Sequence, residues 1–119
     1  MARAIDGSRR KDHRKKILKM AKGYWGRRHS NYKTAKDAVA KSLSYAYRDR
    51  KDKKGDFRRL WILRINAACR AEGLSYSQFI NGLNKAGITI NRKALSNLAI
   101  EDSGAFKTIV EQAKTALGA

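Results

Sequence analysis

In the second half of the chain, apolar residues recur every three or four positions, a spacing typical of amphipathic helices. The first stripe predicts a helix over about residues 57–72, with Asp56 as its N-cap and Gly73 as a left-handed stop. Its inward face is predicted to consist of Phe57, Leu60, Trp61, Ile65, Ala68 and Ala71.

Three further helices are predicted after this one, which together make a compact all-α module of four short helices. Ser75, Asn91 and either Asp102 or Ser103 are suited to cap their first turns, and Gly87 lies near the end of the first. Their inward stripes are Tyr76, Phe79, Ile80 and Leu83, then Leu95, Leu98 and Ala99, then Phe106, Ile109, Val110, Ala113 and Leu117. No stretch alternates with period two for long enough to predict a sheet.

The first 56 residues also show helical spacing, but they carry few large apolar side chains. Gly23 and Gly26 bracket Tyr24 and Trp25 and predict a bend between two helices. The helix before the bend carries Lys11, Lys15, Lys19 and Lys22 on one face. The helix after it runs from about residue 31 to residue 54, with a narrow stripe of Tyr32, Ala35, Val39, Leu43 and Ala46. A helix that is polar nearly all round gains little from packing on its own protein, so a partner must order it.

Composition separates the same two regions. Residues 1–56 hold 8 large apolar residues and residues 57–119 hold 19, so only the second region is expected to bury a core of its own. Residues 1–56 carry 19 Lys and Arg against 6 acids, whereas residues 57–119 carry 9 against 4. We therefore predict an all-α fold with a long basic helical arm over 1–56 and a compact all-helical domain over 57–119.

The net charge of +18 on 119 residues indicates a polyanionic partner, because like charges repel in a compact protein that lacks one. The charges cluster at residues 9–11, 14–16, 27–28 and 48–54. Each Lys or Arg that neutralises a phosphate releases counterions and so drives nucleic-acid binding. Tyr24 and Trp25 lie among these clusters, and aromatic rings of this kind can stack on unpaired bases.

Several residues leave two interpretations open. Tyr32 and Tyr45 either stack on bases or pack against a neighbouring helix. Asp49 either orients an adjacent arginine toward a phosphate or relieves repulsion within its basic run. Arg64 falls on the apolar face of its helix, so it either pairs with an acid of the same module, such as Glu101 or Asp102, or directs its head group outward to nucleic acid. We favour the internal pair.

The sequence offers little for catalysis. His13 and His29 lie in the basic region without a carboxylate at helical spacing, and Cys69 is the only cysteine, which excludes an internal disulfide and a cysteine-based zinc site. The basic N-terminus lacks the apolar run of a secretory signal, and the longest uncharged stretch is too short and polar to span a bilayer. We expect no enzyme, no cofactor, no dedicated metal site and no membrane partner; any Mg²⁺ would belong to the RNA.

Two other functions compete with RNA binding. A DNA-binding helical module would present polar readers on one compact recognition helix, whereas the basic region here is long, kinked and aromatic. A membrane-active helix would need a wide face of Leu, Phe or Trp opposite its lysines, whereas the stripe here is mainly Ala and Tyr.

Five motifs in register resemble the L-twenty family of bacterial large-subunit ribosomal proteins over nearly the whole chain. They are Lys22-Gly23-Tyr24-Trp25-Gly26-Arg27-Arg28, Tyr45-Ala46-Tyr47-Arg48-Asp49-Arg50, Phe57-Arg58-Arg59-Leu60-Trp61-Ile62 with Arg64-Ile65-Asn66-Ala67, Gly73-Leu74-Ser75-Tyr76-Ser77 with Phe79-Ile80, and Asn91-Arg92-Lys93 with Leu95. The chain departs from the family pattern at Asp6, Asp12, Gly55 and Cys69.

The resemblance implies a cytoplasmic, ribosome-bound, non-catalytic protein that binds 23S ribosomal RNA directly and is needed for large-subunit assembly. It implies the proteins numbered thirteen and twenty-one as neighbours, and some family members also bind their own messenger. No homo-oligomer is expected. With the charge pattern, it predicts RNA contacts at Arg3, Arg9, Arg10, Lys11, Arg14, Lys15, Lys16, Lys19, Lys22, Tyr24, Trp25, Arg27, Arg28, Lys33, Lys36, Arg48, Arg50, Lys51, Lys53, Lys54, Arg58, Arg59, Arg70, Arg92 and Lys93.

Overall fold

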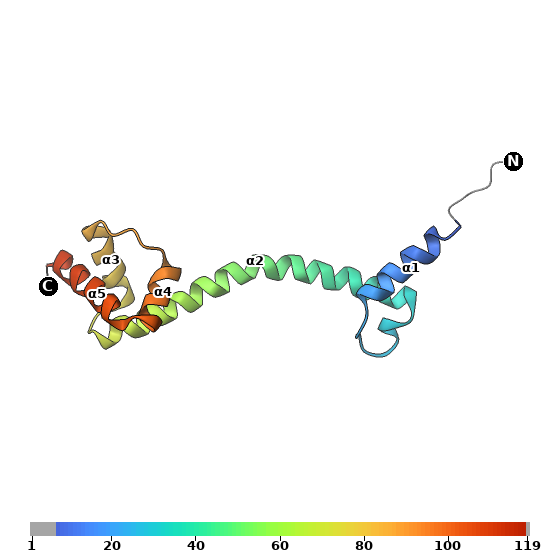
Figure 1. Cartoon of the computed structure of the whole chain (residues 1–119), viewed down its shortest axis with the longest axis horizontal. Coiled ribbons are helices and arrows are strands. Elements are labelled where there is room, and N and C mark those ends of the chain that lie inside the picture. The colour runs from blue at the N-terminus through green and yellow to red at the C-terminus, as the bar shows by residue number, and fades with distance from the viewer. Residues whose placement is uncertain (1–6, 119) are drawn as a thin grey trace. The chain divides into compact units, whose positions relative to one another are not determined.

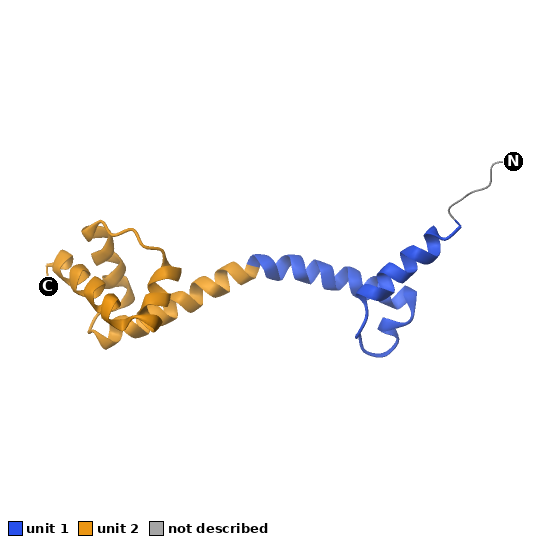
Figure 2. Ribbon diagram, viewed as in Figure 1, with its two compact units in different colours: residues 1–51 blue, residues 52–119 orange. Residues whose placement is uncertain are grey.

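The computed structural model describes residues 7–118, and all regular structure in that range is helical (Figure 1). The elements are α1 (Arg9–Met20), a 3₁₀ turn η1 (Gly26–His29), α2 (Tyr32–Ala71), α3 (Tyr76–Ala86), α4 (Arg92–Glu101) and α5 (Ser103–Leu117). The prediction of an all-α fold with a long basic helix and a smaller helical C-terminal part is confirmed. The chain divides into two compact units, residues 1–51 and 52–119 (Figure 2).

The capping pattern of the last three helices is also confirmed. Ser75 and Gln78 form a reciprocal capping box at the start of α3, and the Asn91 side chain accepts a hydrogen bond from the backbone of Ala94 in the first turn of α4. Of the two candidates for α5, it is the Asp102 carboxylate that accepts from a first-turn amide, that of Ala105.

One predicted boundary is wrong. Asp56 does not cap a new helix, because α2 continues through Gly55 and Asp56 without interruption from Tyr32 to Ala71. A glycine inside a helix costs only about 1 kcal/mol relative to alanine, and strong helix formers lie close by at Lys54 and Arg58, so the helix tolerates it. The Asp56 carboxylate lies 3.8 Å from Arg59 one turn later, as an exposed pair on the helix surface.

The core of unit 2 joins the C-terminal part of α2 to α3, α4 and α5. Its buried members are Ile65, Cys69, Leu74, Phe79, Leu83, Leu95, Phe106, Val110 and Ala113. Phe79 and Phe106 lie with ring centroids 5.5 Å apart, and α3 meets α5 so closely that a Cβ on Gly82 would lie 2.6 Å from the Ala113 carbonyl oxygen. The inward stripes predicted for α3, α4 and α5 all contribute to this core or pack against it.

The inward face predicted for residues 57–71 is only partly correct. Phe57 and Leu60 are exposed, because they lie on α2 before the point at which the core begins at Ile65. Arg64 is exposed as well, which overturns the favoured internal pair with Glu101 or Asp102. Helical spacing placed these side chains on one face, but only its middle part is covered: Ile65 is buried, Trp61 and Ala68 are half-buried, and Ala71 at the end of the helix is exposed.

Unit 1 has a small core that the apolar count did not anticipate. Ala21, Ala35 and Val39 are buried together, and Ile17, Leu18 and Tyr24 pack against them. Small side chains let the end of α1 approach α2 closely, so a hairpin forms despite the lack of large apolar residues. The expectation that only residues 57–119 bury a core was therefore wrong.

Candidate nucleic-acid interface

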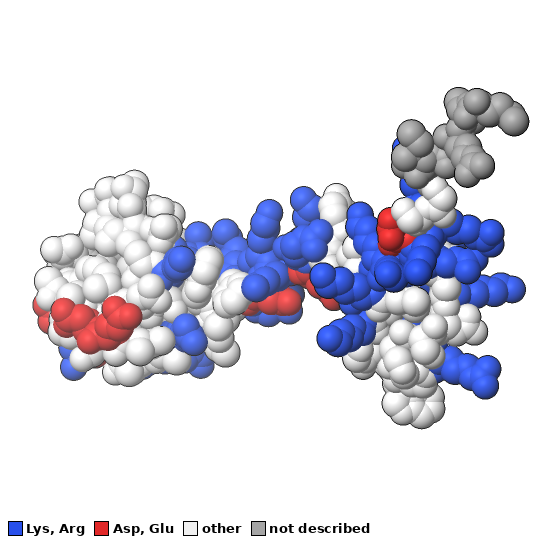
Figure 3. All heavy atoms as spheres, turned by 45° about the vertical axis from the view of Figure 1, so that its right-hand side comes forward, with Lys and Arg blue, Asp and Glu red and all other residues white. Residues whose placement is uncertain are grey.

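Helix α1 presents its cations to solvent on all sides. Its seven predicted contact residues are exposed: Arg9, Arg10, Lys11, Arg14, Lys15, Lys16 and Lys19. The helix ends at Met20, so Lys22 follows it in the turn and does not extend the lysine face. Figure 3 shows lysine and arginine side chains gathered over α1 and the N-terminal part of α2. The predicted contact Arg3 lies outside the described residues.

The bend between α1 and α2 separates the roles of two neighbouring aromatics. Gly23 and Gly26 adopt positive φ angles of 91° and 65°, which few other residues tolerate, so the predicted bend is real. Tyr24 is half-buried against the small core of unit 1, and its carbonyl accepts a hydrogen bond from Nδ1 of His29 at 2.9 Å. Trp25 is 91 % exposed, which leaves its ring available to a partner.

The middle of α2 has almost no buried face. Between residues 40 and 60, every residue except Ala46 is exposed, including all basic positions from 48 to 59. These are the predicted contacts Arg48, Arg50, Lys51, Lys53, Lys54, Arg58 and Arg59, and Lys33 and Lys36 are exposed nearer the start of the helix. Because these residues are exposed, burial within the protein contributes little to this part of α2, and its basic side chains are accessible to an external partner.

Cations lie beside the aromatic rings along α1 and α2. The Arg48 guanidinium lies 4.6 Å and the Lys41 amino group 5.5 Å from the Tyr45 ring centroid, and Lys51 lies 5.4 Å from that of Tyr47. Tyr45 and Tyr47 are exposed, so the packing alternative for Tyr45 is excluded. This mixture of positive charge and π surface suits the phosphates and bases of a nucleic acid.

Tyr32, in contrast, packs against a neighbouring helix. It is half-buried, with His13 of α1 edge-on at 6.3 Å between ring centroids and the Arg14 guanidinium 5.2 Å from its ring. Tyr32 therefore holds α1 against α2. Asp49 accepts a hydrogen bond from Nε of Arg48 at 3.0 Å, so it orients that arginine.

The predicted RNA contacts of unit 2 differ in their exposure and in their hydrogen bonds within the protein. Arg70 and Lys93 are exposed, and Arg70 donates to the Asn66 side chain at 3.3 Å. Arg92 is half-buried, and its Nε donates to the Tyr76 hydroxyl at 2.7 Å, which ties the start of α4 to α3. Arg92 thus has a structural role that the charge pattern did not reveal.

The described residues hold no metal-binding cluster, and their one cysteine is buried. Burial raises the pKa of Cys69 to about 12, so at neutral pH it is a thiol and a poor nucleophile. Residues 7–118 contain no group of three or more His, Cys, Asp or Glu side chains placed to hold a metal ion. Nor does any helix in this range have the length and apolarity needed to cross a bilayer.

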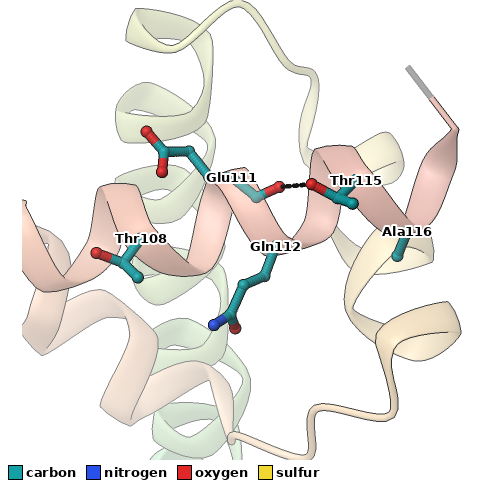
Figure 4. A pocket seen from close by; sticks show the side chains of 5 residues that line it. All are labelled: Thr108, Glu111, Gln112, Thr115 and Ala116. Carbon is teal, nitrogen blue, oxygen red and sulfur yellow. Dashed lines mark hydrogen bonds between the residues drawn. The ribbon is translucent and has the colours of Figure 1, made fainter.

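Each unit carries a surface hollow among its described residues. One of about 480 Å³ lies along α5 and is lined only by side chains of that helix, with Glu111 as its one charged group (Figure 4). The other, of about 920 Å³, lies in unit 1 between the bend and α2. It includes Asp37 and Lys41, which the basic clusters in the sequence did not single out, although both share a helical face with Tyr45.

These features define an all-helical protein with an exposed basic surface suited to a polyanion. The family model for ribosomal protein L20 matches residues 3–109. The chain is 61 % identical over 118 residues to the large ribosomal subunit protein bL20 of Treponema denticola, covering 99 % of each chain. It is 62 % identical over 115 residues to that of Brachyspira hyodysenteriae, covering 97 % of this chain and 98 % of the relative.

The chain therefore belongs to the ribosomal protein L20 family. This confirms the family resemblance drawn from its five motifs and the expectation of a non-enzymatic structural constituent of the ribosome.

Proposed function

We propose that the chain binds 23S ribosomal RNA directly through unit 1 and the middle of α2, and that this binding is needed to assemble the large subunit. One observation carries the proposal: residues 40–60 form a helix that is exposed on all sides and rich in cations. The names of the relatives, which place them in the large ribosomal subunit, support the choice of ribosomal RNA over other polyanions.

The mechanism rests on charge neutralisation. RNA helices repel each other, and a row of lysines and arginines between them lowers that repulsion as condensed counterions are released. The ordering of the exposed part of α2 is coupled to this step, because residues 40–60 contribute no buried side chain to either core. The RNA thus stabilises this part of the helix, as burial in a hydrophobic core stabilises other helices.

Contacts beyond the RNA follow from the family resemblance. The large-subunit proteins numbered thirteen and twenty-one are the proposed neighbours, and Leu63 and Ile100 in unit 2 are exposed apolar side chains that such contacts can cover. No cofactor is needed for a role of this kind, and any Mg²⁺ involved is proposed to belong to the RNA. The site of action is the ribosome in the cytoplasm.

The test is the salt dependence of binding to 23S ribosomal RNA. If about 10 phosphates are engaged, the logarithm of the affinity falls against the logarithm of salt concentration with a slope of about −7 to −9. The variant Lys51→Gln/Lys53→Gln/Lys54→Gln is expected to make that slope shallower by about 2 to 3. A control, Lys85→Gln/Lys107→Gln, changes lysines of unit 2 outside the predicted contacts and should leave it unchanged.

A near-flat slope for the unaltered protein, or equal effects of the two variants, contradicts the phosphate mechanism. Reconstitution of large subunits without this chain tests the assembly role, and it is expected to stop at an incomplete particle. Completion of normal subunits without the chain contradicts that role.

A further inference from the structure

The hollow in unit 1 is a groove whose two sides come from different parts of the chain. One side is the bend, with Tyr24, Trp25 and Arg28. The other is a single face of α2 over four turns, made by Thr34, Asp37, Ala38, Lys41, Ser42, Tyr45, Ala46 and Asp49. Its volume of about 920 Å³ lies within the range of about 300–1,000 Å³ found for ligand pockets.

The groove has a fixed frame. Tyr24 packs on the buried cluster of Ala21, Ala35 and Val39, which holds the bend against α2. The hydrogen bond from His29 to the Tyr24 carbonyl closes the loop of the bend. Trp25, the next residue, is held by this frame yet remains 91 % exposed. An aromatic ring exposed in this way on an ordered loop can stack on an unpaired base.

The chemistry of the lining matches the parts of a nucleotide. Trp25 and Tyr45 offer aromatic faces, and Lys41 and Arg28 offer positive charge for a phosphate. The small side chains of α2 between them leave room for a flat ring. Aromatic rings alone would accept any base, because stacking is tolerant of sequence.

Asp37 is the feature that phosphate binding does not explain. A carboxylate in a strongly basic unit opposes phosphate binding, and Asp37 makes no hydrogen bond or ion pair with another residue in the described range. Carboxylates instead accept hydrogen bonds from the amino groups of bases, as Asp and Glu do from N4 of cytosine. Uracil has no exocyclic amino group, and its one donor at the pairing edge, N3–H, lies between two carbonyl oxygens that repel a carboxylate.

We propose that this groove holds one unpaired RNA base bearing an exocyclic amino group, stacked on Trp25 and hydrogen-bonded through that amino group to Asp37. The proposal rests on the proposed binding to 23S ribosomal RNA and adds to it a base-reading site. The cations along α1 and α2 then provide affinity, and the groove sets the register of the protein on the RNA.

Chemical probing of 23S ribosomal RNA in complex with the full chain tests the groove. At the pairing edges of the bases, dimethyl sulfate modifies adenine and cytosine, kethoxal modifies guanine, and a carbodiimide modifies uracil. The variants are Trp25→Ala and Asp37→Ala, each with a matched control. Trp25→Phe keeps an aromatic ring, and Asp52→Ala removes an exposed carboxylate of α2 that does not line the groove.

One unpaired adenine, cytosine or guanine is expected to be protected by the unaltered chain and both controls, and to regain its free reactivity with Trp25→Ala and Asp37→Ala. The affinity of Trp25→Ala is expected to fall roughly fivefold or more. A responding uracil, no responding base within an otherwise intact footprint, or Asp37→Ala behaving like Asp52→Ala overturns the groove proposal alone. Loss of the whole footprint for the unaltered chain overturns the proposed RNA binding itself.

Discussion

At the scale of single residues, Cys69 shows how burial sets chemistry. Its side chain is 0 % exposed in the core of unit 2, and burial raises the pKa of the thiol from 9.0 to about 12. Desolvation is the cause, because the charged thiolate loses the water that would stabilise it. The residue therefore acts as a small apolar side chain at the junction of α2 with the core.

The shifted pKa predicts a pH dependence of stability. In the unfolded chain the thiol ionises above about pH 9, while the folded protein keeps its proton to about pH 12, so stability is complete below pH 9 and falls above it. The contribution lost approaches about 1.4 kcal/mol per pH unit within this range. Urea unfolding at pH 8 and pH 10.5 should show a smaller pH effect for Cys69→Ala than for the unaltered chain. Identical pH effects contradict the assignment.

Gly82 is a residue whose role depends on what lies opposite it. A Cβ at this position would lie 2.6 Å from the Ala113 carbonyl oxygen and 2.9 Å from the Ala113 Cβ, both on α5. Backbone atoms cannot yield as the end of a side chain does, so α3 and α5 must separate to admit a methyl group.

We expect Gly82→Ala to lower the free energy of unfolding by about 1–3 kcal/mol, as measured by urea denaturation followed by circular dichroism. Alanine favours a helix intrinsically, so the substitution would stabilise the protein if the helix pair were loosely packed there. A rise in stability would therefore rule out the close approach of α3 to α5.

At the scale of elements, α2 is one continuous helix that contributes residues to the cores of both units. Its last turns supply Ile65 and Cys69 to the core of unit 2, and its first turns supply Ala35 and Val39 to the core of unit 1. Between these anchors, residues 40–60 are exposed except for the half-buried Ala46. Its persistence there depends on intrinsic helix propensity and on the proposed RNA partner.

Gly55 is the weakest point of that middle segment. It is helical, its φ is not positive, and nothing lies within 4 Å of the position a Cβ would occupy. Gly55→Ala is therefore expected to increase helicity and to stabilise the segment by about 0.5–1 kcal/mol. Far-ultraviolet circular dichroism of the free protein measures this.

The matched control is Gly23→Ala. A Cβ on Gly23, like one on Gly55, would meet no atom within 4 Å, but the φ of Gly23 is 91°. This variant is expected to destabilise the bend, since alanine tolerates that conformation poorly. Loss of helicity in Gly55→Ala would instead indicate that α2 ends near this glycine.

At the scale of the whole molecule, charge and burial are distributed in opposite ways. Unit 2 holds the large buried side chains, whereas unit 1 holds a core of three small residues and most of the exposed cations. The two units should therefore differ in how far they depend on a partner for order.

Hydrogen exchange should report this difference directly. In the free protein, backbone amides of α3 to α5 are expected to be protected, whereas those of residues 40–60 exchange rapidly despite their helical hydrogen bonds. Addition of 23S ribosomal RNA should protect residues 40–60 and leave the core of unit 2 unchanged. Strong protection of residues 40–60 without RNA would contradict the proposed coupling of binding to order.

The sequence alone determined the helical class, the caps at Ser75 and Asn91, the bend at Gly23 and Gly26, the basic charge pattern and the family resemblance, and it narrowed the last cap to Asp102 or Ser103. These depend on charge or on interactions within about four residues, which a linear pattern records.

Only the tertiary structure decided which parts of each face are covered. It showed the passage of α2 through Gly55, the exposure of Phe57 and Arg64, and the groove that gathers Trp25 with Asp37. Burial depends on which distant segment packs against a residue, and helical spacing carries no information about where that segment begins or ends.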